Sequence, residues 1–478
     1  MRDKETYRSP LATRYATAEM VENFTDLRRA RVFRDLWIAL ARAERELGLP
    51  ITEDQIAALE AARDRIDLEE VARLEAKLRH DVMAHVHHFG DVAGPDAARI
   101  LHLGATSCFV ADNADLVLYR RGMDLLLDRL YALVDALRDF AVRFADVPTL
   151  AYTHFQPAQL TTVGKRACLW LQDLVFDFER LDALRRDLPF RGAKGTTGTQ
   201  ASYLALFDGD HEKVRALDRM IAERMGFSRT IPVCGQTYTR KIDTWIVATL
   251  ADIAGSVAKM ASDVRLLSHE REVEEPFGRH QVGSSAMAYK RNPMRCERIC
   301  GLARFVHSLG TSPRETHANQ WLERTLDDSA NRRLVLTEAF LATDAILNLA
   351  VDVASGLEVH PAVVEAHVRA ELPFMITENV LMAATKAGGN RQELHERIRR
   401  HSMASVERMK REGVACDLLD RLRSDPDLGP HVDANVLDPA RYVGRAPEQV
   451  REFDAEVVAP LLSSHEARRG RFVSKLRV

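Results

Sequence analysis

The sequence predicts an all-α protein with three helical domains, the second of which is a bundle of long helices. Three observations predict this class. Apolar residues recur at helical spacing over long stretches, turn residues are sparse between them, and the alternation of strands and helices typical of a βαβ protein is missing. Helices of such length suit a bundle, because neighbouring helices then cover each other's apolar faces.

The first long helix is expected to begin at Asp112, since a carboxylate is well suited to an N-cap. Apolar residues follow at alternating steps of three and four, which places them on one helix face. Comparable patterns cover 163–188, 241–269 and 331–349. The first stripe consists of Leu116, Tyr119, Met123, Leu126, Leu130, Val134, Leu137, Phe140 and Phe144.

Shorter helices are expected on both sides of the bundle. One ends at Gly48, because glycine commonly stops a helix, and the next begins with a capping box formed by Thr52 and Gln55. After Gly356 the helices are expected to shorten again, with a break at Gly388. We therefore expect an N-terminal helical domain over 1–106, the long-helix bundle over 107–359 and a C-terminal helical domain over 360–478.

Composition and charge exclude several classes of protein. The net charge of −3 argues against a nucleic-acid-binding surface, so cations for an anionic ligand must be gathered locally. No apolar run is long enough to cross a membrane, and the first residues lack the apolar core of a signal peptide. The six cysteines show no C-x-x-C pairing, which predicts reduced thiols in a cytoplasmic protein.

The most informative stretch runs from Gly283 to Pro293 and reads Gly-Ser-Ser-Ala-Met-Ala-Tyr-Lys-Arg-Asn-Pro. Its lysine and asparagine can hold an anion, and Pro293 suits the first turn of a following helix. The spacing alone fits either a substrate loop that docks on a helix N-terminus or an ordinary polar loop. The wording resembles the signature loop of the fumarase/aspartase superfamily, whose enzymes eliminate fumarate from a succinyl group.

In that superfamily the loop usually reads Gly-Ser-Ser-x-Met-Pro-x-Lys-x-Asn-Pro, so Ala288 stands in place of the first proline. Alanine frees one backbone dihedral and adds an N–H group, which changes loop stiffness rather than chemistry. The resemblance implies that Ser284 is the catalytic base. It also implies that Lys290 and Asn292 face the succinyl part of the substrate.

The segment Tyr152–Gln159 is expected to precede a helix. A histidine at a helix entrance is most often a capping or surface residue. The segment resembles the Thr-His-x-Gln-x-Ala region of the superfamily, which implies that His154 is the general acid. Glu297 matches the carboxylate that pairs with this histidine and favours its protonated form, although an exposed helix-face charge is the alternative.

The segment Arg79–Asp81 precedes a histidine-rich stretch over 85–88, which raises the question of a metal site. The spacing of His80 and His85 does not place them on one helix face as zinc ligands, and no H-E-x-x-H sequence is present, so we expect no metal. Arg79–Asp81 resembles a substrate-contacting segment of the adenylosuccinate lyases. The other three histidines are expected to be packing or surface residues.

The glycine- and threonine-rich stretch Arg191–Gln200 superficially resembles a phosphate loop. It lacks both the P-loop order and the dinucleotide-binding fingerprint, so a nucleotide-hydrolysing loop is not expected. A loop that offers backbone N–H groups to a bound anion remains reasonable.

The stretch Glu323–Arg333 carries three arginines and a serine. It fits a solvated turn between helices, but guanidinium groups and a hydroxyl are also suited to phosphate. The stretch resembles the adenylosuccinate lyases nearly residue for residue, as do 13–16, 104–108, 235–238 and 371–389. The resemblance covers essentially the whole chain and is strongest to the longer, animal-type members of that family.

This resemblance implies an anti β-elimination of fumarate from adenylosuccinate and from succinyl-aminoimidazole carboxamide ribotide (SAICAR), which gives AMP and AICAR. It implies a homotetramer with active sites shared between subunits, no cofactor, no metal and no membrane partner. The catalytic residues are then His154, Ser284, Glu297, Lys290 and His80. The substrate-binding residues are Arg14, Tyr15, Arg79, His80, Asp81, Thr106, Ser107, Thr153, Gln236, Lys290, Asn292, Arg298, Arg324, Ser329 and Arg333.

Two alternatives remain at the level of sequence. Another fumarate-releasing lyase, such as argininosuccinate lyase or fumarase, would share the signature loop but has no use for a phosphate-type cluster around Ser329. A non-catalytic relative, as in the lens crystallins of this superfamily, would be expected to lose the catalytic residues. Ser284, His154, Lys290 and Glu297 are all present.

Overall fold

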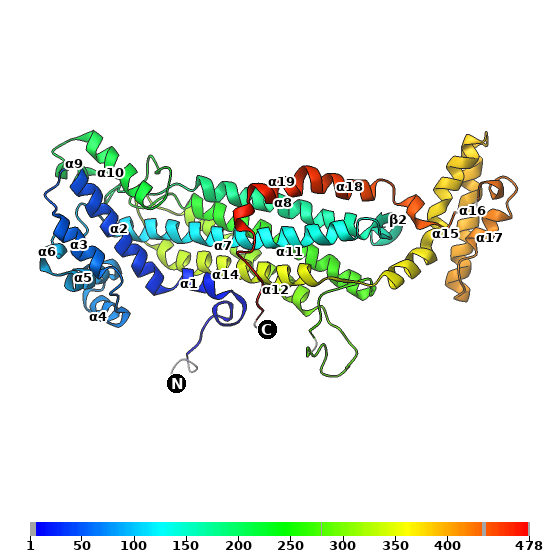
Figure 1. Cartoon of the computed structure of the whole chain (residues 1–478), viewed down its shortest axis with the longest axis horizontal. Helices are drawn as coiled ribbons and strands as arrows, with labels where there is room; N and C mark the ends of the chain where they lie inside the picture. The colour runs from blue at the N-terminus through cyan, green and yellow to red at the C-terminus, as the bar shows by residue number, and fades with distance from the viewer. Residues whose placement is uncertain (1–5, 279, 433–435, 477–478) are drawn as a thin grey trace.

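The computed structural model describes residues 6–278, 280–432 and 436–476. The molecule is elongated, with short helices at one end, long helices along its middle and a second helical group at the other end (Figure 1). Helices far outnumber strands in the described residues, so the predicted all-α class is confirmed.

The middle of the molecule is a bundle of long helices whose facing sides are apolar. The predicted stripe is buried except for the half-buried Phe144 at its end, and Leu116, Met123 and Leu130 are each 0% exposed. This burial explains why the periodic segments are helices, since each covers the apolar face of its neighbours. The bundle helices are α7 (Ser107–Arg143), α8 (Val163–Asp187), α11 (Lys241–His269), α12 (Met294–Leu309) and α14 (Asp327–Gly356).

Helix α14 has the length and mean hydropathy of a membrane span. However, 83% of its apolar window is buried inside the protein, between α7, α11 and α12. Its position at the centre of the bundle accounts for its apolar sequence.

The prediction that the first long helix begins at Asp112 was wrong. Helix α7 begins at Ser107, with Thr106 as its N-cap, and Asp112 lies a full turn inside it. The Asp112 side chain is buried and accepts hydrogen bonds from Arg240, so its carboxylate serves a tertiary ion pair rather than a helix cap.

The short helices at one end are α1 to α6, joined by the later helices α9 and α10 (Figure 1). The predicted helix stop at Gly48 and the predicted capping box of Thr52 and Gln55 are both confirmed. The bounds are α1 (Ala18–Asn23), α2 (Asp26–Glu46), α3 (Glu53–Ala62), α4 (Leu68–Leu78), α5 (Asp81–Ala93), α6 (Pro95–Ala98), α9 (Ala201–Leu206), α10 (His211–Arg224) and, beside the bundle, α13 (Ser312–Ala318).

Two short antiparallel sheets lie at the other end of the bundle, β1 (Pro148–Thr153) with β2 (Gln156–Thr162) and β3 (Val273–Glu274) with β4 (Glu358–Val359). The expectation that Tyr152–Gln159 precedes a helix is confirmed, but the sequence did not predict the strand pairing within this segment. The segment forms a hairpin, and helix α8 begins only after it, at Val163.

The C-terminal region has two parts. Helices α15 (Pro361–Lys386), α16 (Arg391–Glu412) and α17 (Leu418–Arg423) form a separate apolar core, to which the β1–β2 hairpin contributes Leu150 and Leu160. The expected shortening after Gly356 was wrong for α15, with 26 residues, and α16, with 22, whereas α17 is short as expected. Helices α18 (Ala446–Phe453) and α19 (Ala459–Ser464) return to the bundle and lie along α8 (Figure 1).

Short 3₁₀ or π segments complete the described structure. They are Leu11–Tyr15, Gly429–His431, Pro439–Tyr442, Asp454–Val458 and Glu466–Arg468.

Candidate active site

One group of predicted site residues meets at the end of the bundle where α7 begins. His80 is the N-cap of α5, and its Nδ1 accepts the backbone N–H of Met83 at 3.2 Å. The neutral imidazole therefore carries its proton on Nε2. This nitrogen lies 3.3 Å from Oγ of Ser107, which brings His80 and Ser107 together.

Ser107 is the first residue of α7. The N-cap Thr106 makes no side-chain capping bond, so its hydroxyl leaves the first N–H groups of a 37-residue helix uncapped. Such a helix start carries partial positive charge and favours a bound anion. The hydroxyls of Thr106 and Ser107, the imidazole of His80 and this helix start therefore form one surface whose chemistry suits an anion.

Gln236 joins two loops to this surface. Its backbone N–H donates to the carbonyl of Glu323 at 3.0 Å, and its side-chain amide donates to the carbonyl of Thr196 at 3.1 Å. Its Oε1 lies 3.6 Å from Sγ of Cys108, next to Ser107. The two loops and the start of α7 are therefore held together around one amide.

The glycine- and threonine-rich stretch Arg191–Gln200 carries two buried cations. Arg191 is fully buried and donates to the carbonyl of Gln236 at 2.9 Å, and buried Lys194 forms an ion pair with Asp218. These two cations therefore hold the loop in place, while Thr196 and Thr197 are exposed.

Helix α14 brings two predicted phosphate-binding residues to the same end. Arg333 donates to Oδ2 of Asp81 at 2.9 Å, so the segment that begins at Arg79 and the arginine-rich segment meet in space. Ser329 and Arg333 are four residues apart and share one helix face. The pair Asp328 and Arg332 occupies the adjacent face, which is buried.

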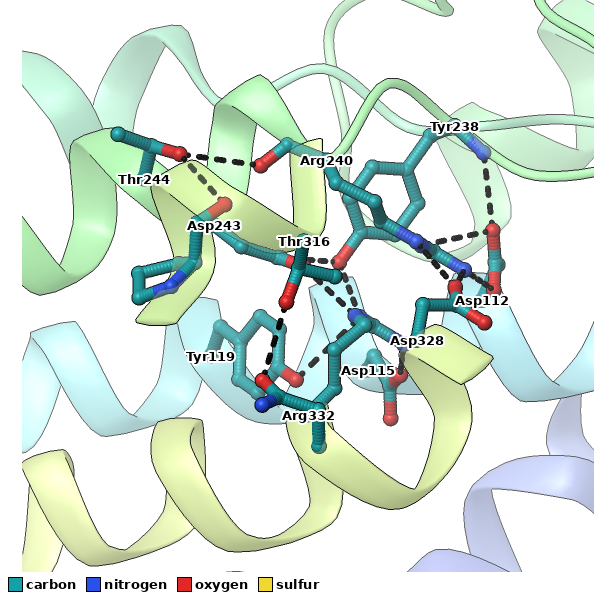
Figure 2. A network of polar contacts seen from close by, with 12 residues as sticks. Asp112, Asp115, Tyr119, Tyr238, Arg240, Asp243, Thr244, Thr316, Asp328 and Arg332 are labelled. Atoms are coloured by element: carbon teal, nitrogen blue, oxygen red, sulfur yellow. Dashed lines mark hydrogen bonds and ion pairs between the residues drawn. The ribbon is translucent and has the colours of Figure 1, made fainter. Parts of the chain in front are cut away.

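A buried ionic network lies beneath this surface and connects α7, α11 and α14 (Figure 2). Arg240 donates to Asp328 at 2.7 Å and to Asp112 at 3.1 Å. Arg324 donates to the other oxygen of Asp328 at 2.8 Å. Arg324, a predicted substrate-binding residue, is therefore tied to the core through one shared carboxylate.

The second half of the network surrounds Arg332. Its guanidinium contacts Asp243 at 2.6 Å and Asp115 at 2.9 Å (Figure 2). Burial acts to raise the pKa of Asp115, but Arg29 and Arg332 outweigh it and hold this pKa below its usual value. Asp243, Tyr238 and Asp115 likewise raise the pKa of Arg332 against the effect of burial, so Asp115 and Arg332 form a charged pair at neutral pH.

A second group of predicted residues lines a cavity of about 450 Å³ along the bundle. Tyr15 lies between two guanidinium groups, with Arg14 at 5.9 Å and Arg298 at 5.7 Å from its ring centroid. Two cations and an aromatic ring in one cavity suit a flat, anionic ligand.

The signature loop brings Ser284, Lys290 and Asn292 to an exposed segment below the bundle (Figure 1). Oγ of Ser284 accepts the backbone N–H groups of Ala286 at 3.3 Å and Met287 at 3.1 Å. Asn292 closes the loop by donating to the carbonyl of Gly283 at 2.7 Å. Two N–H donors on one serine oxygen favour its negatively charged form, as a serine base requires.

Sequence reasoning did not single out Arg291, which holds the end of this loop. Its guanidinium contacts Glu274 at 3.2 Å and Glu358 at 3.0 Å and lies 5.0 Å from the Phe277 ring centroid. The two carboxylates and His360 have the spacing of a metal-binding group, but Arg291 already provides the cation that contacts both.

His154 lies at the tip of the β1–β2 hairpin, and its side chain is exposed. His154 and Phe155 form the two-residue turn with φ of 53° and 56°, a left-handed pair that asparagine and glycine adopt more readily. Phe155 and Thr153 are exposed as well. Non-glycine residues in this conformation are strained and are typical of functional sites.

The predicted site residues around Ser107 and the predicted general acid His154 lie far apart within one chain. Ser107 begins α7, whereas His154 follows its C-terminal end, and a helix of 37 residues spans about 55 Å. Glu297 is exposed in the first turn of α12. Among the described residues, no hydrogen bond or ion pair joins His154 to Ser284, Lys290 or Glu297.

The remaining histidines of the 85–88 stretch serve packing, as predicted. His85 packs edge-on against Phe33, and burial lowers its pKa to about 4. Buried His88 accepts the backbone N–H of Asp67 at 3.0 Å, and His87 is exposed.

Comparison with known proteins identifies the class. The family model described as "Lyase" matches residues 11–307, and the model described as "Adenylosuccinate lyase C-terminus" matches residues 373–453. A solved 3-carboxy-cis,cis-muconate lactonizing enzyme from Pseudomonas putida has a TM-score of 0.80 at 26% identity, covering 96% of this chain and 99% of its own. The fold and the signature loop thus define a lyase of the fumarase/aspartase superfamily.

Relatives of higher sequence identity identify the family within this class. The adenylosuccinate lyase of Schizosaccharomyces pombe is 50% identical over 97% of both chains, and that of Schistosoma mansoni is 48% identical over 98% of both. An adenylosuccinate lyase from Pyrococcus abyssi is 31% identical over 92% of this chain and 96% of its own. The chain belongs to the adenylosuccinate lyase family.

Proposed function

We propose that this protein is an adenylosuccinate lyase, a carbon–nitrogen lyase that releases fumarate from adenylosuccinate to give AMP and from SAICAR to give AICAR. The observation that carries this proposal is 50% identity to an enzyme of that name over 97% of the chain. The structure supports it with clustered arginines and hydroxyls, which suit a phosphate- and carboxylate-bearing substrate despite a net charge of −3.

The reaction is an anti β-elimination. The alkoxide of Ser284 removes a proton from the succinyl Cβ, the carbon–nitrogen bond breaks as the double bond of fumarate forms, and His154 gives a proton to the departing nitrogen. The backbone N–H groups of Ala286 and Met287 lower the cost of the alkoxide, and Lys290 adds positive charge. Glu297 favours the protonated His154. These groups need no cofactor.

Substrate binding is divided between surfaces in this proposal. Thr106, Ser107, Thr153, Gln236, Lys290 and Asn292 contact the succinyl part, with His80 between the two parts of the substrate. The nucleotide part contacts Arg14, Tyr15, Ser329 and Arg333, and its remaining charges are met by Arg79, Asp81, Arg298 and Arg324.

The proposed site requires several subunits. Ser107 begins α7, a helix of about 55 Å, and His154 follows its other end, so one chain does not complete a site. The bundle also exposes large apolar side chains, including Phe176 at 59%, Trp245 at 48% and Leu334 at 68%. Such a surface suits burial against copies of the same chain. We therefore infer a homotetramer with shared active sites.

Complementation tests the shared site. His154→Gln and Ser284→Ala chains are expected to be inactive alone, whereas mixed oligomers regain activity because some sites receive both intact residues from different chains. Mixed oligomers that are confirmed by native mass spectrometry and remain inactive contradict the shared site. An active monomer contradicts it directly.

Fumarate release from three substrates tests the activity. Adenylosuccinate and SAICAR are expected to release fumarate, and argininosuccinate is not. Release from argininosuccinate alone would contradict the proposal.

We also propose that the enzyme is soluble, lies in the cytoplasm and acts in purine biosynthesis. All six cysteines are free thiols, most of them buried, which fits a reducing compartment.

A further inference from the structure

The cavity around Tyr15 is lined in part by residues that were not predicted to belong to the site. On one side it is lined by the N-terminal residues and by Arg298 of α12. On the other side it is lined by Gly470, Arg471, Phe472, Val473, Lys475 and Leu476, the C-terminal tail of the same chain. Segments from the two ends of the chain therefore meet across one cavity of about 450 Å³.

The C-terminal tail, residues 470–476, is fastened to the bundle on both sides of Val473. The ring of Phe472 lies 4.5 Å from the guanidinium of Arg129, which is 1% exposed and paired with Asp344 at 2.5 Å. Further along, Oδ1 of Asn348 accepts the hydroxyl of Ser474 at 2.9 Å. These contacts place the tail in a defined position against α7 and α14.

Asn348 fastens the tail through more than one bond. Its Oδ1 also accepts the backbone N–H of Lys475 at 3.3 Å, and its backbone carbonyl accepts the Ser474 hydroxyl at 2.9 Å. Asn348 itself is 3% exposed and lies within the apolar stretch 345–351 of α14. Burying the Asn348 amide would cost free energy if Ser474 and Lys475 did not bond to it. The tail is therefore part of the folded structure.

The tail adds two cations to the cavity. Arg471 and Lys475 join Arg14 and Arg298, against one carboxylate, Glu19, among the lining residues. That carboxylate is already bonded to Arg129 at 3.1 Å. Among the described residues, the ammonium of Lys475 has no hydrogen-bond or ion-pair partner. The cavity thus has positive charge on both walls and an exposed ammonium that no side chain neutralises.

We propose that the C-terminal tail is a wall of the nucleotide site and that Lys475 is a further substrate-binding residue, with its ammonium contacting the phosphate of the bound nucleotide. The proposal rests on the proposed function for the identity of the ligand. It assigns to the tail a direct part in binding, whereas Asn348 and Phe472 act as positioning residues that seat it.

Binding of AMP, measured by isothermal titration calorimetry, tests this without turnover. Lys475→Met is expected to weaken AMP binding about ten- to a hundredfold, the effect of one charged hydrogen bond. Lys410→Met, which removes an exposed lysine from α16, is the matched control and is expected to bind AMP as the wild type does. Adenosine, which lacks the phosphate, is expected to bind Lys475→Met and wild type equally.

A second variant tests the tail as a unit. Asn348→Leu removes the acceptor of the tail while keeping the volume of the side chain, and is expected to weaken AMP binding and to expose residues 470–476 to protease. AMP is expected to slow this cleavage in the wild type. Unchanged AMP affinity in Lys475→Met, or an equal loss for adenosine, would overturn the proposal.

The outcomes separate this inference from the proposed function. If the wild type releases fumarate from adenylosuccinate and binds AMP, but Lys475→Met binds AMP normally, only the role of the tail is wrong. If the wild type releases no fumarate from adenylosuccinate, the proposed function is wrong. If it also fails to bind AMP, the nucleotide site and the role of the tail are both wrong.

Discussion

The surface around Ser107 and the signature loop around Ser284 are built in opposite ways. The first rests on a buried network in which Arg240 is 1% exposed and bonds two carboxylates (Figure 2). The second is an exposed segment in which, among the described residues, Ser284 bonds only to N–H groups of its own loop. One chain therefore carries a firmly held surface that suits an anion and, separately, an exposed segment that holds the predicted base.

This difference fits a chain in which one region binds the substrate and another carries the base. Binding many charges requires groups held at fixed distances, and a core of ion pairs provides this. In the proposed shared site, the base reaches a substrate held by another subunit, so a segment that closes after the substrate arrives and excludes water is an advantage.

Removal of the base should affect the catalytic segment alone. Ser284→Ala is expected to lower kcat by about 10⁴-fold, the upper range for loss of a proton-transfer group, while the affinity for adenylosuccinate stays within about twofold. Single-turnover assays and equilibrium binding measure the two quantities. Ser285→Ala is the matched control, and wild-type turnover in Ser284→Ala would move the role of base to another residue.

Sequence reasoning predicted the helices well because their apolar periodicity is a local signal. It failed where the structure is decided by an interaction between residues far apart in the sequence. Asp112 has the chemistry of a helix cap, but its partner Arg240 lies 128 residues away. Helix α15 runs through Pro373, although proline usually interrupts a helix, so its full length is not apparent from such local signals.

The hairpin that carries His154 was also hidden from sequence reasoning. Its turn places histidine and phenylalanine at left-handed φ values, where a hairpin would usually be signalled by asparagine and glycine. The site residues themselves were predicted from motif wording, and the structure brings His80, Asp81, Ser107 and Arg333 together. The wording could not indicate that His154 lies at the far end of α7.

Breaking the buried network should cost folding stability. Arg240→Met leaves the carboxylates of Asp112 and Asp328 without this partner and is expected to reduce the free energy of unfolding by about 3–5 kcal/mol. Chemical denaturation at fixed protein concentration measures this. Adding Asp112→Asn to Arg240→Met should recover part of the loss, because the uncompensated charge is then smaller. A loss of less than about 1 kcal/mol in Arg240→Met contradicts the structural role of the network.

Removing a cation from the firmly held surface should weaken binding with little effect on the core. Arg333→Ala is expected to raise KM for adenylosuccinate about ten- to a hundredfold, equivalent to about 1.5–3 kcal/mol. Arg333 also pairs with Asp81, so Asp81→Asn is the matched control. If Arg333 acts mainly on the substrate, Asp81→Asn raises KM less than Arg333→Ala does. Equal effects would instead show that the ion pair is what matters.

The smallest effect is expected where the signature loop meets the fold. Arg291 contacts Glu274 and Glu358 at the edge of the β3–β4 sheet, and it is 43% exposed. Exposed ion pairs contribute at most about 1 kcal/mol, so Arg291→Met should change the free energy of unfolding by less than that. Because the arginine fixes one end of the loop that carries Ser284, we expect kcat to fall about three- to tenfold with little change in AMP affinity.

The conservative change Arg291→Lys separates anchoring from charge. A lysine retains one positive charge but does not provide the planar fork that spans Glu274 and Glu358, so it should restore only part of the lost kcat. Arg304→Met, an exposed position on α12 beyond the loop, should leave kcat unchanged. A wild-type kcat in Arg291→Met would mean that the loop positions Ser284 without this contact. The signature loop would then be lightly held even at its base, unlike the fixed surface around Ser107.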